Sequence, residues 1–153
     1  MLRMNKLYIV IAWGISCFLF YAVAAHADER DQSTKLTFSE PVRLPNVTLP
    51  AGTYWFKLLD SASERDIVQI FNADRTVLYA TEISVPTLRQ KRSDNTVVTL
   101  AQQAPGEADA LLKWFYPSEE TGHEFIYPAQ VEQQLAQDRK QIVVVNGHAE
   151  SGD

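Results

Sequence analysis

His123 and Glu124 are the adjacent residues of this chain best suited to acid–base chemistry. Successive residues of a strand point to opposite faces of the sheet, so these two side chains cannot easily act together. The sequence contains no Gly-x-Ser-x-Gly nucleophile elbow and no glycine-rich phosphate loop. A hydrolase would require a cleft that brings His123 to a carboxylate on another strand, and it is the least favoured of our hypotheses.

Histidines and acidic residues do not form a recognisable metal-binding pattern. The histidines that follow residue 27 are His123 and His148, and no His-x-x-x-His spacing is present. The turn around Asp74 lacks the oxygen-ligand spacing of a calcium loop, and the adjacent Arg75 opposes a cation. We therefore expect no catalytic residue, no metal and no cofactor.

Aromatic residues gather in a predicted hairpin whose loop spans residues 117–122. If Tyr116 faces His123, antiparallel register pairs Trp114 with Phe125 on the same face. We favour the interpretation that this aromatic face is core, because large aromatic side chains stabilise by burial and exposed apolar patches are rare without a partner. The alternative is a platform on which sugar rings or an acyl chain stack.

Trp55 offers a second aromatic candidate. It lies in a predicted strand over residues 53–59, on a mixed face that also holds Lys57, so we expect its indole to be half exposed. Structural packing is again the favoured interpretation. The possible ligand or partner surface then consists of Trp55, Trp114, Tyr116, His123 and Tyr127.

Charged side chains suggest one ion pair and one basic cluster. On the second face of the hairpin, Lys113 and Glu124 become diagonal neighbours, close enough for an exposed pair worth about 0–1 kcal/mol. Arg89, Lys91 and Arg92 lie together in the predicted loop over residues 86–95. A solvated loop tip is the favoured interpretation of this cluster, and the alternative is a salt-sensitive contact with an anionic polymer.

The first 27 residues have the pattern of an export signal. Arg3 and Lys6 precede an uncharged apolar run over residues 7–25, and Ala25-His26-Ala27 forms a small-x-small cleavage site. Cleavage would leave a chain that begins at Asp28 in the periplasm or outside the cell. The run is close to the roughly 20 residues that cross a bilayer, so an uncleaved anchor is the alternative. Lipidation of Cys17 is less favoured, because the residues after it stay apolar.

Composition limits what the remaining chain can bind. Removing residues 1–27 leaves 126 of 153 residues, enough for a single domain with one core. Two of the 14 basic residues and none of the 19 acidic ones are removed, so the net charge becomes −7. Such an acidic domain is expected to bind nucleic acids and anionic membranes poorly. The one cysteine, Cys17, is removed as well, so we expect no disulfide and no membrane span after cleavage.

Short runs of alternating apolar residues, separated by turn clusters, indicate a mainly β protein. We predict an antiparallel β-sandwich or partly open barrel of seven to nine strands, with one short helix near the C-terminus. The predicted organisation is a signal peptide (1–27), a flexible lead-in (28–34), a single domain (35–145) with its helix at 129–140, and a flexible tail (146–153). Pro128 lies at or before the first turn of that helix.

Several motifs taken together resemble a family of small exported bacterial β-proteins. They are Leu-Pro-Ala-Gly-Thr-Tyr-Trp-Phe-Lys-Leu at 49–58, Ile-Val-Gln-Ile-Phe at 67–71, Trp-Phe-Tyr-Pro at 114–117 and Gly-His-Glu-Phe-Ile-Tyr-Pro at 122–128. The resemblance covers residues 35–140, and it implies export and a β fold. It assigns no catalytic or binding residue.

Two kinds of function fit these observations better than an enzyme does. The leading hypothesis is an exported, non-enzymatic module that binds or supports an envelope protein, a glycan or another extracellular partner. The alternative is a structural or assembly subunit that uses an open sheet edge. Residues 142–145 and 41–47 are the candidate edge strands.

Overall fold

The computed structural model describes residues 32–59 and 66–145, and it shows the mainly β fold that the sequence predicts. The predicted signal peptide, most of the lead-in, the tail and His148 lie outside the described residues. The described elements are β1 (Ser33–Phe38), β2 (Val42–Arg43), β3 (Thr48–Leu49), β4 (Gly52–Leu58), β5 (Ile67–Asn72), β6 (Leu78–Leu88), β7 (Thr96–Ala101), β8 (Asp109–Phe115), β9 (Thr121–Phe125), α2 (Ala129–Gln137) and β10 (Lys140–Val145).

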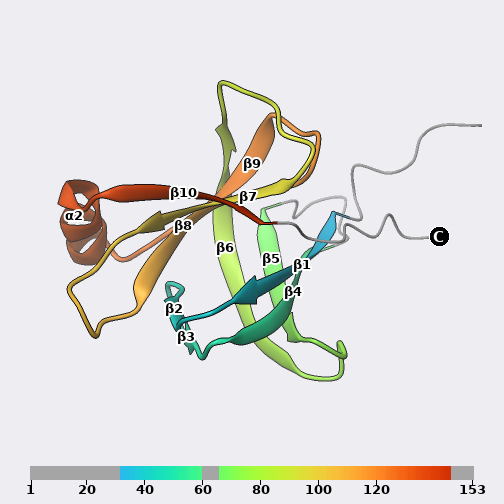
Figure 1. The fold of residues 1–153 in the computed structure, drawn as a ribbon, viewed down its shortest axis with the longest axis horizontal. Coiled ribbons are helices and arrows are strands. Elements are labelled where there is room, and N and C mark those ends of the chain that lie inside the picture. The colour runs from blue at the N-terminus through green and yellow to red at the C-terminus, as the bar shows by residue number, and fades with distance from the viewer. Residues whose placement is uncertain (1–31, 60–65, 146–153) are drawn as a thin grey trace, which may run out of the picture.

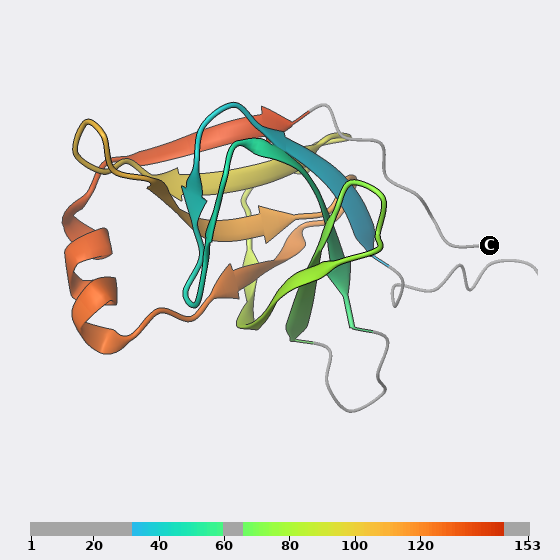
Figure 2. The same cartoon turned by 90° about the horizontal axis from the view of Figure 1, so that it is seen from below.

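The strands form one large mixed sheet in the order β1-β4-β5-β6-β9-β8-β2-β3, and β7 pairs with both β8 and β10. Strand β6 connects two parts of this sheet, because its first half pairs with β5 and its second half pairs with β9 (Figure 1). Strands β2 and β8 are parallel, which differs from the purely antiparallel arrangement predicted. Figure 2 shows β10, β7 and β8 side by side, with α2 at one end of the molecule.

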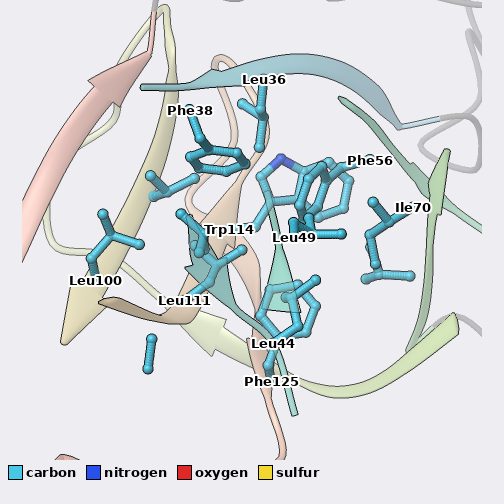
Figure 3. Packing of buried hydrophobic residues seen from close by; sticks show 14 of the residues in the cluster. Leu36, Phe38, Leu44, Leu49, Phe56, Ile70, Leu100, Leu111, Trp114 and Phe125 are labelled. Carbon is cyan, nitrogen blue, oxygen red and sulfur yellow. The ribbon is translucent and has the colours of Figure 1, made fainter. Parts of the chain in front are cut away.

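The core lies on the face where apolar side chains from several strands meet. Leu36 on β1, Phe56 on β4 and Ile70 on β5 are fully buried, as their alternation along each strand predicts. They pack with Trp114 of β8 and with Phe125 of β9 in one cluster (Figure 3). Segments far apart in the sequence therefore share a single apolar interior.

Strand β6 is longer than the sequence predicts. Residues 86–95 are predicted as a loop, but β6 continues through Pro86 to Leu88. Pro86 lies opposite His123 of β9. Proline lacks a backbone donor, and it is tolerated here because the second half of β6 pairs with a described strand on one edge only.

The helix and the domain start also differ in extent from the predictions. Strand β1 begins at Ser33, inside the predicted lead-in, and α2 ends at Gln137 rather than at residue 140. Pro128 is the N-cap residue, as predicted. Among the described residues, no helix is long and apolar enough to cross a membrane.

Candidate functional site

The aromatic hairpin formed by β8 and β9 belongs to the interior. Trp114 is fully buried, and Phe125, Tyr127 and His123 are 4%, 5% and 8% exposed. Tyr116 lies just beyond β8, is half-buried and packs against the core. Four of the five residues in the predicted ligand surface are therefore interior or packed on the interior, which leaves little of their ring surface for a sugar or an acyl chain.

The hairpin register differs from the prediction by two residues. Trp114 lies opposite His123 rather than Phe125. Gly122 accounts for this register, because a Cβ atom there would lie 2.3 Å from the ring of Phe115 and 2.7 Å from the backbone oxygen of Trp114. Phe115 therefore requires a glycine beside it, and the register that places Gly122 there shortens the connection between the two strands to residues 116–120.

Polar atoms of the buried rings are occupied by structural hydrogen bonds. The indole Nε1 of Trp114 donates to Oγ1 of Thr34 at 2.9 Å. The hydroxyl of Tyr127 lies 2.8 Å from the backbone oxygen of Arg43 and 2.9 Å from that of Leu111. Burial raises the pKa of Tyr127, which keeps this hydroxyl protonated as a donor. These bonds tie the hairpin to β1 and β2.

His123 contacts a buried serine rather than an acidic residue. Its Nδ1 lies 3.2 Å from Oγ of Ser84, and that hydroxyl donates to the backbone oxygen of Asp66 at 2.8 Å. Because the single proton of Ser84 is used in this way, Nδ1 of His123 carries the proton that joins the two side chains. Burial lowers the pKa of His123, and Asp66 partly opposes that effect. Ser84 is 2% exposed, so its hydroxyl is not an accessible nucleophile.

Glu124 points away from His123, as expected for adjacent strand residues. Its carboxylate lies 3.0 Å from Nζ of Lys113, and both side chains are partly exposed. The predicted ion pair is therefore present, although the two residues lie directly opposite each other rather than diagonally.

Trp55 is buried, which corrects the expectation of a half-exposed indole. It is 7% exposed, because the guanidinium of Arg75 lies 3.6 Å from the ring centroid and Nζ of Lys35 lies 5.8 Å from it. Its Nε1 donates to the backbone oxygen of Ala73 at 3.0 Å. Side chains from β1 and from the β5–β6 turn thus cover a ring that its own strand leaves outside the core.

The basic cluster does not present three free cations. The guanidinium of Arg89 lies 5.4 Å from the ring centroid of Phe115, and its Nη2 donates to the backbone oxygen of Ser93 at 3.1 Å. Arg92 lies 3.7 Å from Glu120, and both are exposed. Lys91 is exposed at the surface of the loop. Contact of this cluster with an anion stays a prediction that rests mainly on Lys91 and Arg92.

Strand β10 (Lys140–Val145) is an edge strand among the elements that the structure describes. It makes six consecutive antiparallel pairs with β7, without a bulge, and no other described strand pairs with it. The amide of Gln102 donates to the oxygen of Arg139, next to this ladder. Arg139 and Gln102 thus form a hydrogen-bonded pair, and hydrogen-bonded and non-hydrogen-bonded pairs alternate along an antiparallel ladder. Ile142 and Val144 therefore occupy non-hydrogen-bonded pairs, and their backbone groups point away from β7. We call these outward groups, with the two side chains, the β10 edge.

The β10 edge carries apolar side chains and no charge. Ile142 is 71% exposed and Val144 is 55% exposed. Lys140 is the sole charged residue of the strand, and its ammonium donates to the backbone oxygens of Leu135 and Asp138 at the end of α2. Natural edge strands are commonly protected by lysines, prolines or bulges. The lysine of β10 is directed back to the helix instead.

The second predicted edge, over residues 41–47, is not an open strand of useful length. Strand β2 lies between β8 and β3, and β3 has two residues. Asn46 holds the turn between them. Its side-chain Nδ2 donates to Oε2 of Glu82 at 2.8 Å, and its backbone N–H donates to Oε1 at 3.3 Å. Glu82 is fully buried, and this burial raises its pKa.

The sequence did not reveal which strand faces are exposed along β6. Nine large apolar residues are exposed in the described chain: Val77, Leu78, Tyr79, Ile83, Val85, Leu88, Ile126, Ile142 and Val144. Most belong to β6 or its preceding turn. The one available signal was Glu82 and Ser84, two polar residues at alternate positions whose burial only the fold discloses.

Comparisons with protein-family models, with curated proteins and with solved structures found no match to this chain. In the described residues, no group of three or more His, Cys, Asp or Glu side chains could hold a metal ion.

Proposed function

We propose that this chain is an exported, non-enzymatic β-domain that binds a partner polypeptide by adding a strand to the β10 edge. The observation that carries the proposal is an edge strand with exposed apolar side chains and outward backbone groups, whose one charged residue, Lys140, is hydrogen-bonded to the end of α2. Strand addition uses such groups for affinity and the neighbouring side chains for specificity.

The chemistry of the β10 edge defines the partner. Its backbone would exchange hydrogen bonds with Ile142 and Val144, so the partner must offer an extended segment without proline at the paired positions. Apolar or β-branched residues at every second position would pack beside the two exposed side chains. Because the chain that begins at Asp28 is acidic, with 12 basic and 19 acidic residues and a net charge of −7, basic residues flanking that segment would speed association.

A polypeptide fits this surface better than a glycan does. Stacking of sugar rings needs exposed aromatic faces, whereas Trp114, Tyr127 and Trp55 are 0%, 5% and 7% exposed. The β10 edge offers backbone donors and acceptors in a strand register, which is the geometry that another strand matches.

Site-specific photocrosslinking in the exporting cell tests the proposal. A crosslinking residue at Ile142 should trap one discrete polypeptide other than this chain. The same residue at Leu88, which is 76% exposed and lies outside the β10 edge, should not. Equal trapping at both positions, an adduct with a second copy at Ile142, or no adduct would contradict the proposal.

A proline substitution sharpens this experiment. The amide of Val144 points away from β7, so Val144→Pro should leave the domain folded while it blocks a partner strand. Combined with the crosslinking residue at Ile142, it should abolish the adduct. Val144→Ala is the matched control and should retain it. An adduct that survives Val144→Pro would show that trapping does not depend on strand pairing.

Export makes a separate prediction. The intact mass of the protein recovered from outside the cytoplasm should correspond to a chain that begins at Asp28. Protein recovered only from the cytoplasm would contradict this part of the proposal.

A further inference from the structure

Strand β6 has its polar and apolar faces reversed. Along four consecutive residues, Glu82 and Ser84 are 0% and 2% exposed, whereas Ile83 and Val85 are 62% and 44% exposed. A strand with one buried face ordinarily directs its apolar residues inward. Here the same alternation directs them outward.

Neighbouring strands extend this outward surface. Ile83 lies opposite Ile67 of β5, and the amide of Ile126, just after β9, donates to the oxygen of Ile83 at 3.3 Å. Ile126 is 47% exposed. Three isoleucines thus form a row across three segments, with Val85 beside it. We call Ile67, Ile83, Val85 and Ile126 the β6 face.

Hydrogen bonds fix the β6 face outward. Glu82 accepts from Asn46 in the β2–β3 turn, and the hydroxyl of Ser84 bonds to Asp66 and His123. A rotation of β6 that buried its apolar residues would break all these bonds and would expose the polar groups that hold them. The apolar exposure can therefore be relieved by another molecule rather than by repacking.

Charges at the border of the β6 face identify the occupant. Val85 lies opposite Glu124, which in turn lies opposite Lys113 at an Nζ–Oε2 distance of 3.0 Å. One positive and one negative group at the border of a neutral patch are self-complementary under a twofold axis, because each lysine can approach the glutamate of the other copy. We propose that the β6 face packs against the β6 face of a second copy of this chain, independently of the β10 edge.

The size of the β6 face sets the expected affinity. Stable interfaces bury about 800 Å² on each partner, more than four side chains supply. We therefore expect a reversible dimer with a dissociation constant on the order of micromolar.

Sedimentation of the exported protein over a range of concentrations, from about 1 μM to 1 mM, tests this inference. The wild-type protein should pass from monomer to dimer. Ile83→Lys should weaken dimerisation at least about tenfold, because it places a charge in the apolar row. Ile142→Lys is the matched control, since it alters an equally apolar residue on the β10 edge, and it should leave dimerisation unchanged.

Charge exchange provides a test that does not depend on the isoleucines. Lys113→Glu and Glu124→Lys should each impair self-association, because like charges then meet across the twofold axis. An equimolar mixture of the two variants should form a heterodimer, in which every contact across the axis joins opposite charges. Circular dichroism should show both variants folded, since the exposed pair is worth about 0–1 kcal/mol.

Three results would overturn the inference. They are a monomer throughout the concentration range, association that Ile142→Lys weakens while Ile83→Lys does not, and a mixture of charge variants that stays monomeric. The second result would move self-association to the β10 edge and would also count against a different polypeptide there, whereas the other two leave the β10 proposal intact.

Discussion

Strands β8 and β10 lie on opposite sides of β7 and use their apolar residues in opposite ways. In β8, Trp114 is fully buried, stacks on His123 with a centroid distance of 5.4 Å and donates a hydrogen bond to Thr34. In β10, Ile142 is 71% exposed and its backbone faces away from the only described strand that pairs with it. The difference follows from the face that each side chain takes, because Trp114 points into the core, whereas Ile142 lies on the opposite face of its strand from Val143 and Val145, which pack against the core.

The comparison separates structural from functional candidates. A conspicuous aromatic residue in a central strand stabilises the fold by burial. An exposed aliphatic residue on an edge strand, such as Ile142, contributes little to the stability of the monomer, so its exposure calls for another explanation. The β10 edge, rather than the aromatic hairpin, is therefore the surface that we assign to binding.

The largest expected effect comes from shortening one side chain in each strand, β8 and β10, to alanine. Trp114→Ala should cost about 3–5 kcal/mol of unfolding free energy, because it empties a buried site and leaves Thr34 without its donor. Ile142→Ala should change stability by less than about 0.5 kcal/mol. Urea denaturation followed by far-ultraviolet circular dichroism measures both. Similar losses from the two variants would erase the distinction.

Two glycines offer a finer test of the hairpin. Gly122→Ala should cost about 1–3 kcal/mol, because its Cβ would collide with the Phe115 ring and with the backbone of Trp114. Gly52→Ala is the control, since its nearest neighbour is the hydroxyl of Tyr54 at 3.3 Å, a much milder contact than those at Gly122. In the same denaturation assay, Gly122→Ala should have a clearly lower free energy of unfolding than Gly52→Ala. The reverse order would contradict the observed register.

The buried histidine should make stability fall in mild acid. Burial lowers the pKa of His123 in the folded state below its ordinary value of 6.5, so the unfolded chain binds a proton more readily. This contribution is fully present above pH 6.5 and is lost as the pH falls toward the folded-state pKa. Unfolding free energies measured from pH 7.5 to 5 should decline for the wild-type protein and less steeply for His123→Gln. Parallel profiles would contradict this assignment.

The buried glutamate should act in the opposite direction. Its folded-state pKa is raised above 4.5 by burial, so ionisation penalises the folded state more than the unfolded one. Its contribution is most favourable in acid and is lost as the pH rises through the raised pKa. Glu82→Gln should flatten this small rise in stability on acidification while it retains an acceptor for Asn46. An unchanged pH profile would show that Glu82 does not titrate differently in the folded state.

The sequence predicted the faces of the simple strands well. The period of two along a strand places Leu36 with Phe38, and Tyr54 with Phe56, on one face, and all four residues are buried. Trp55, between Tyr54 and Phe56, is buried as well, under the side chain of Arg75. The predicted register of the hairpin was wrong, because the observed register depends on a contact between Phe115 and Gly122 that composition does not encode.

Exposure was harder to predict than secondary structure. Trp55 is covered by Arg75, which reaches it from a turn where it adopts a positive φ of 58°, and no local pattern indicates such a cover. On β6, alternation predicts two faces but not which one turns inward. Partners distant in sequence, such as Asn46 for Glu82, decide that question. The candidate edge at residues 142–145 was predictable because its run of uncharged apolar residues lies close to the polar tail.

Amide hydrogen exchange of the isolated protein, measured residue by residue by nuclear magnetic resonance, tests the central claim most directly. If the outer side of β10 is open, the amides of Ile142 and Val144 should exchange at least about tenfold faster than that of Val143, whose backbone faces β7. Equal protection of all three amides in the monomer would show that the edge is already covered, and it would contradict the account.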